Sequence, residues 1–92
     1  MIVGKVIGSV VSTRKCDTLV GNKLMIIEPL SSMGNPEKKI VAVDNIGAGI
    51  GELVLVSLGS AARIGEHENA PVDAAIVGIV DSGNGLVGDK LQ

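Results

Sequence analysis

The stretch that decides the fold is IGAGIGELVLVSLGSAAR, residues 46–63. It opens with the alternating glycines Gly47, Gly49 and Gly51, and it continues directly into an apolar run at residues 53–56. A phosphate-binding loop needs a helix after its glycines, because the helix N-terminus faces the anion. Here a strand pattern follows and no Lys-Ser/Thr pair is present, so the glycines do not predict a nucleotide site. They predict a backbone that adopts positive φ or that closely approaches another backbone.

Short runs rich in Val, Ile and Leu recur along the whole chain and predict five strands. The predicted strands are residues 2–11, 23–28, 39–44, 52–57 and 74–81. The first of them is apolar on both faces, which is typical of a strand that is covered on both sides. One short helical turn is predicted at residues 60–63, where Ser60 can cap the turn and Gly65 can end it. Together these elements predict an all-β fold, a small five-stranded barrel with one short helical turn.

The composition predicts a single domain, residues 1–92, with a small core. The chain has no Phe, Tyr or Trp, yet 46% of its residues are hydrophobic. Aromatic side chains supply the largest burial per residue, so a core of Val, Ile, Leu and Ala stays small. Excess aliphatic surface on a small domain predicts burial against another chain, and hence an oligomer.

Charge and hydropathy exclude several classes of partner. The formal net charge is −2, and the basic residues do not cluster as a nucleic-acid interface requires. A barrel that binds single strands also needs aromatic side chains for stacking, and this chain has none. No run reaches the roughly 18 apolar residues of a membrane span, and the first residues do not form a basic leader. With one cysteine, no intrachain disulfide is possible, and we expect a cytoplasmic protein without a nucleic-acid or membrane partner.

Side chains that could carry out chemistry are present but scattered. Cys16 and His67 could form a nucleophile and its base, with Asp17 or Asp44 as an orienting group. A lone cysteine and a lone histidine occur in many small domains, so this set predicts no catalytic residues. No spacing brings several ligands to one metal ion, and Glu66–Glu68 is interpreted as a solvated loop. No catalytic, metal or cofactor site is predicted, and the chain is not expected to be an enzyme.

Two long motifs resemble those of a known family. They are VAVDNIGAGIGELVLVSLGSAAR at residues 41–63 and PVDAAIVGIVD at residues 71–81. Both are similar to sequences of bacterial microcompartment shell vertex proteins, the EutN/CcmL family. The amino end agrees with that family at Gly4, Val6, Gly8, Val10, Thr13, Lys15 and Lys23-Leu24. One departure is Ala61, because many relatives have a second serine there after Ser60.

The resemblance implies an OB-like barrel that assembles as a cyclic homopentamer and has no catalytic activity. Such pentamers sit at the vertices of a polyhedral shell in the cytoplasm, whose facets are tiled by separate hexameric shell proteins. The resemblance also implies that the glycine-rich stretch is a subunit-contact or pore loop. The residues expected there are Ile46, Gly47, Ala48, Gly49, Ile50, Gly51 and Glu52, followed by Ser60 and Arg63. The alternative function is an OB-like binding module for nucleic acid or a small ligand.

Overall fold

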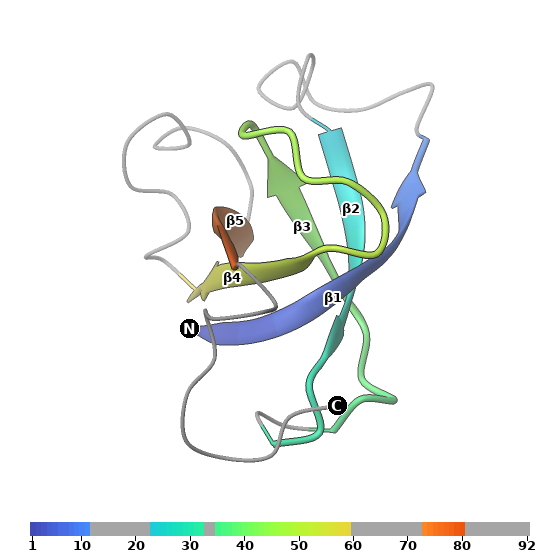
Figure 1. Ribbon diagram of the computed structural model, residues 1–92, viewed down its shortest axis with the longest axis vertical. Coiled ribbons are helices and arrows are strands. Elements are labelled where there is room, and N and C mark those ends of the chain that lie inside the picture. The colour runs from blue at the N-terminus through green and yellow to red at the C-terminus, as the bar shows by residue number, and fades with distance from the viewer. Residues whose placement is uncertain (12–22, 33–34, 60–72, 81–92) are drawn as a thin grey trace.

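Five β-strands make up the regular structure of the protein (Figure 1). The computed structural model describes residues 1–11, 23–32, 35–59 and 73–80. The strands are β1 (Ile2–Val10), β2 (Lys23–Pro29), β3 (Ile40–Asp44), β4 (Leu53–Leu58) and β5 (Ala74–Val80). Every predicted strand is present, and each end lies within one residue of its predicted position. The all-β class is therefore confirmed, whereas the helical turn predicted at residues 60–63 lies outside the described residues.

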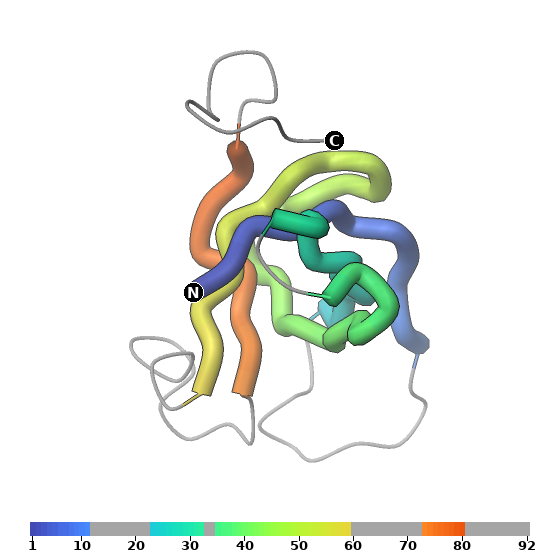
Figure 2. Tube along the Cα trace, turned by 90° about the horizontal axis from the view of Figure 1, so that it is seen from below, coloured from blue at the N-terminus to red at the C-terminus, as the bar shows by residue number. Residues whose placement is uncertain are grey.

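The strands close into a barrel in the order β1-β2-β3-β5-β4 (Figures 1 and 2). Strand β1 closes it by pairing antiparallel with both β2 and β4, and a bulge between Val6 and Gly8 bends it between these partners. Strand β5 is inserted between β3 and β4, which is the OB-like arrangement. Its pairing with β4 extends along the whole strand, but its parallel pairing with β3 is confined to Val43 and Ala75. The predicted OB-like barrel is confirmed, and β5 is held chiefly by β4.

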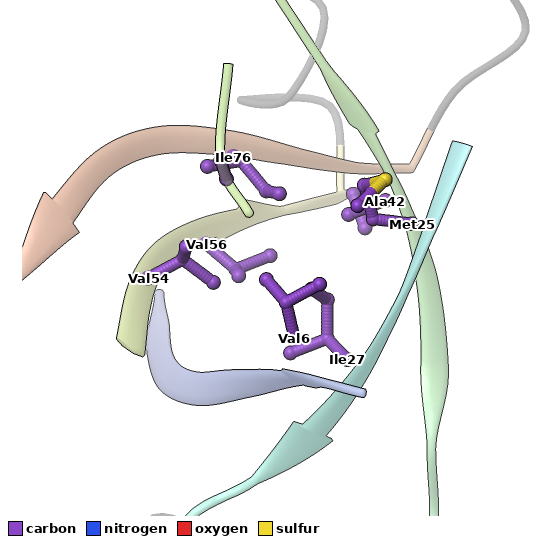
Figure 3. Close-up of a cluster of buried hydrophobic side chains, with 9 residues drawn as sticks. Val6, Met25, Ile27, Ala42, Val54, Val56 and Ile76 are labelled. Atoms are coloured by element: carbon purple, nitrogen blue, oxygen red, sulfur yellow. The ribbon is translucent and has the colours of Figure 1, made fainter. Parts of the chain in front are cut away.

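The barrel interior is filled by short aliphatic side chains (Figure 3). They come from all five strands and from the loop between β3 and β4: Val6, Met25, Ile27, Ala42, Ala48, Val54, Val56, Ala74 and Ile76. Successive side chains of a strand point to opposite faces, so only one face of each strand supplies this core. The narrow interior of a five-stranded barrel suits such side chains, and this explains how the chain folds without aromatic residues.

Gly4 lies where β1 is enclosed most tightly by its neighbours. It pairs with Pro29 of β2 on one side and with Val54 of β4 on the other. A Cβ atom added at Gly4 would lie 2.5 Å from Ile27 Cγ2 and 2.9 Å from the Glu28 carbonyl oxygen. Ile27 is completely buried, so it has no free space into which it can move. The glycine is therefore required by the close approach of two strands.

The outer side of β1 is covered only in part within the single subunit. Val3 is buried there, whereas Ile7 and Val10 are exposed, so the prediction that both faces of the whole strand are covered stays a prediction for the assembled protein. Among the helices of the described residues, none has both the length and the apolar character needed to cross a membrane.

Candidate functional site

The first half of the glycine-rich loop is organised by the carboxylate of Asp44, the last residue of β3. Asp44 Oδ1 accepts hydrogen bonds from the N–H groups of Ile46 (2.9 Å) and Gly47 (3.2 Å), and Oδ2 accepts one from Ala48 N–H (2.8 Å). Asp44 is only 3% exposed, and its bond to Ala48 is buried, whereas the bonds to Ile46 and Gly47 are partly buried. Gly47 has a φ of 83°, which lets consecutive N–H groups turn toward one point. The protein's own carboxylate thus occupies an anion-binding concavity of the backbone.

This arrangement explains why glycines typical of a phosphate loop occur here without a phosphate. The three N–H groups that could cradle an anion already donate to Asp44. It also corrects the idea of Asp44 as the orienting group of a catalytic set, since both of its oxygens accept backbone hydrogen bonds. Cys16, Asp17 and His67, the other members of that set, lie outside the described residues. Within the described part of the chain, no group of three or more His, Cys, Asp or Glu side chains could hold a metal ion.

The second half of the loop is a tight turn over residues 49–52. Glu52 N–H donates to the Gly49 carbonyl (3.1 Å), and Gly49 N–H donates to Glu52 Oε1 (2.6 Å). Gly51 is the third residue of this turn and has a φ of 94°, as a type II turn requires. Gly51 N–H donates to the Val6 carbonyl (2.7 Å), and Val6 N–H donates to the Glu52 carbonyl (2.9 Å). Two loop residues thus oppose one residue of β1, which is a β-bulge that begins with a left-handed glycine.

The prediction of positive φ is confirmed at Gly47 and Gly51 and is wrong at Gly49. A glycine is favoured at position 49 for a different reason. The Glu52 carboxylate folds back over this residue and accepts a hydrogen bond from its N–H group. A Cβ atom added there would lie 3.3 Å from Glu52 Oε1. At Gly47 and Gly51 an added Cβ would meet no atom within 4 Å, so their backbone angles rather than crowding explain these glycines.

The side chains of the loop divide into one anchor and two exposed apolar groups. Ala48 is 4% exposed and packs into the barrel core. Ile46 is 47% exposed and Ile50 is 68% exposed, although both are large aliphatic residues. The hydrogen bonds of Asp44 and Glu52 therefore fix a backbone that presents two isoleucines to the surroundings.

Gly51→Ala is expected to lower the free energy of unfolding by about 1–2 kcal/mol, because an L-residue with a side chain is strained at positive φ. Gly49→Ala is the matched control. Its backbone angle is ordinary, and the flexible Glu52 side chain can move by the small amount needed, so a smaller loss is expected. Urea unfolding at one protein concentration measures both. A larger loss for Gly49→Ala than for Gly51→Ala would contradict this assignment of the strained position.

The sequence of this chain matches known proteins over most of its length. The family described as ethanolamine utilisation protein EutN/carboxysome matches residues 1–81 of this chain. The chain belongs to the EutN/CcmL family. The bacterial microcompartment shell vertex protein GrpN of Rhodospirillum rubrum (strain F11) is 48% identical over 84 residues, which cover 89% of this chain and 94% of GrpN. The family predicted from the two sequence motifs is thereby confirmed.

Solved structures of EutN/CcmL proteins share the barrel. The structure of CcmL from Nostoc sp. PCC 7120 is similar with a TM-score of 0.81 and 46% identity, and the match covers 88% of each chain. The structure described as the GrpN pentameric microcompartment shell protein from Rhodospirillum rubrum has a TM-score of 0.76 and 48% identity. That match covers 88% of this chain and 93% of GrpN.

The structure gathers most of the predicted site residues of this EutN/CcmL chain into one loop. Residues 46–52 lie together between β3 and β4, whereas Ser60 and Arg63 lie outside the described residues. Asp44 and Val6 hold the loop, and neither role was predicted from the sequence. Asp44 was detectable, because an Asp just before a glycine turn commonly accepts hydrogen bonds from the next N–H groups. The contact between Val6 and the loop could not be predicted from neighbouring residues in the sequence. Val6 bonds to residues 51 and 52 through its backbone, and only the pairing of distant strands brings them together.

Proposed function

We propose that this chain is a structural protein whose homopentamers cap the vertices of a bacterial microcompartment shell. The observation that carries the proposal is the match, over nearly the whole length of both chains, to a solved pentameric shell protein at 48% identity. The relatives in the family are named as shell vertex proteins, so the expected location is the shell of a microcompartment in the cytoplasm. Which metabolism the shell encloses is a property of its other components.

The proposed partners beyond the pentamer are hexameric shell proteins that tile the facets. A sheet of hexamers is flat, and five-fold corners are needed to close it into a polyhedron. A small barrel with an apolar outer surface suits this position, because it gains burial only when neighbouring copies and facet proteins surround it.

The proposal assigns no catalysis to the chain. In support, Asp44 is the only buried charged side chain among the described residues, and both of its oxygens accept backbone hydrogen bonds. A carboxylate held in this way stabilises the loop and is not placed to exchange a proton with a substrate.

The proposed subunit contact is the loop at Ile46–Glu52, with Ser60 and Arg63 in the segment that follows β4. Support comes from the fixed backbone of the loop and from the exposure of Ile46 and Ile50. Rigid loops with exposed aliphatic groups lose little conformational freedom on binding, so they are favourable contact elements.

Cells that lack this protein are expected to make facet proteins and cargo but to lose closed polyhedral shells. Facets without five-fold corners extend into tubes or open sheets, which electron microscopy of the deletion strain detects. The wild-type gene is expected to restore closed shells. Normal closed polyhedra in a strain with no second vertex gene would refute the vertex role and would favour the alternative of an OB-like binding module.

A further inference from the structure

The line between β3 and β5, which we name the seam, is the least paired part of the barrel wall. Within the described residues, each of the other strand pairs is aligned over four to six residue pairs. The parallel pair of β3 and β5 consists of a single bridge between Val43 and Ala75. Fewer backbone hydrogen bonds therefore hold the seam than hold any other pair of neighbouring strands.

Asp44 ends the pairing on the β3 side of the seam. It is the last residue of β3 and directly follows the bridge residue Val43. Its carboxylate accepts hydrogen bonds from the N–H groups of Ile46, Gly47 and Ala48, and these bonds turn the chain away from the strand direction at once. Strand β3 therefore does not continue beside β5 after the bridge.

Strand β5 follows β4 rather than β3 after the bridge. The register between β4 and β5 skips Val77, which directly follows Ile76, so β5 has a bulge at this position. A bulge bends its strand and increases the local twist. Strand β5 nevertheless stays paired with β4 along its whole length, and Gly59 N–H extends this pairing with a hydrogen bond to the Asp73 carbonyl (2.7 Å). The two strands therefore form one unit that meets β3 only at the bridge.

The buried side chains near the seam are mostly small. All four alanines of the described residues are buried, and they lie on β3, on the loop that follows it, or on β5: Ala42, Ala48, Ala74 and Ala75. Strands β1, β2 and β4 supply larger side chains to the core, namely Val6, Met25, Ile27, Val54 and Val56 (Figure 3). Exposing an alanine to water costs less free energy than exposing a valine or isoleucine, because less apolar area is involved. Val43 and Ile76 are the larger buried side chains at the seam.

We propose that the barrel opens along the seam before it unfolds globally. In the open state β5 and the adjoining part of β4 move away from β3, while β1 keeps its pairing with β2. This opening breaks one bridge, whereas separation of any other strand pair breaks at least four aligned pairs. The inference goes beyond the proposed function, and it gives the subunit one line along which its strands can shift. Any contact that spans the seam holds the barrel closed.

Thiol labelling under native conditions tests the opening. Ile76→Cys and Ile27→Cys are each introduced into a chain that also carries Cys16→Ser. Reaction with the aromatic disulfide DTNB is followed at several low urea concentrations and at one protein concentration, and global unfolding of each variant is measured under the same conditions by circular dichroism. A buried thiol reacts only when the structure around it opens, so the labelling rate relative to that of the unfolded chain gives the population of open molecules.

Ile27 is the matched control, because it has the same side chain as Ile76 and is also buried in the core. Its Cγ2 lies 2.5 Å from the place of a Cβ at Gly4, so it packs against β1, which the opening leaves in place. The thiol of Ile76→Cys is expected to react at least about tenfold faster than global unfolding of that variant allows, with a weaker dependence on urea because a partial opening exposes less surface. The thiol of Ile27→Cys is expected to react only at the rate that global unfolding allows.

Two outcomes would overturn the opening along the seam. One is labelling of Ile76→Cys only at the rate of global unfolding, and the other is equally fast labelling of both variants, which would show that opening is not confined to the seam. If Ile76→Cys does not fold, Ala74→Cys replaces it, because Ala74 lies on the same strand in the core and the substitution removes no core atom. The same tenfold excess is expected there, and its absence would overturn the proposal. Each rate is compared with unfolding of the same sample, so the result does not depend on the vertex function.

Discussion

Asp44→Ala is expected to lower the free energy of unfolding by about 3 kcal/mol, one of the two largest effects of any single substitution described for this protein. The substitution removes the acceptor of three backbone hydrogen bonds and leaves the N–H groups of Ile46, Gly47 and Ala48 without a partner. The Ala48 bond is buried, so water cannot readily replace the lost oxygen. Urea unfolding at fixed protein concentration measures the loss, and native mass spectrometry is expected to show a weakened pentamer because the proposed contact loop at Ile46–Glu52 is no longer held.

Asn35→Ala is the matched control for this prediction. Asn35 Oδ1 accepts one hydrogen bond from Glu37 N–H at 2.9 Å, with the same spacing along the chain as Asp44 to Ile46, but at an exposed site. Its loss is expected to be about 1 kcal/mol or less, since water can replace an exposed acceptor. Asp44→Asn is expected to fall between the two, because its amide keeps one acceptor oxygen and adds a donor. Equal stability of Asp44→Ala and Asn35→Ala would contradict the role of Asp44.

Gly4→Ala is expected to destabilise the barrel by about 3 kcal/mol, the second large effect, through overpacking of the core. The added methyl group would lie 2.5 Å from Ile27 Cγ2 and 2.9 Å from the Glu28 carbonyl oxygen. Relief requires β1 to move away from β2 or Ile27 to leave its rotamer, and Ile27 is fully buried. Thermal unfolding followed by circular dichroism measures the change at a fixed concentration.

Gly8→Ala provides the control on the same strand. A Cβ atom at Gly8 would lie 3.6 Å from Ile26 Cδ1, which is an ordinary contact. Removing the extra chain freedom of a glycine from a strand is worth roughly 0.5–1 kcal/mol, so Gly8→Ala is expected to be neutral or slightly stabilising. If both variants unfold at the same temperature, the close approach at Gly4 does not govern the packing of the barrel.

Substitutions at Gly4 and Asp44 are expected to distinguish effects on folding of the subunit from effects on the proposed subunit contact. Gly4 acts inside the barrel, where β1 meets β2, and its replacement is expected to affect the subunit before assembly. Asp44 acts at the junction of barrel and loop, so its replacement is expected to affect both the stability of the subunit and the presentation of Ile46 and Ile50. Ile50 is exposed and takes no part in the barrel core. Ile50→Asp is therefore expected to affect assembly alone.

The sequence by itself determined the strands, because each strand is a short apolar run bounded by glycine or polar residues. It also indicated the position of the loop, and the length and order of two motifs identified the family. The absence of aromatic residues correctly predicted a core of short aliphatic side chains. These properties are encoded in residues that are near one another along the chain, so local patterns are sufficient to read them.

Only the tertiary structure decided why the glycines of the loop are needed and what holds them. Gly51 requires positive φ because Val6, far away in sequence, pairs with residues 51 and 52 across the barrel. Gly49, which looks the same in the sequence, has an ordinary φ and is limited by the carboxylate of Glu52. Gly4 and Gly8 also read alike in β1, yet only Gly4 faces a buried side chain at short distance. Strand register brings these partners together, and register depends on the pairing of residues that are distant along the chain.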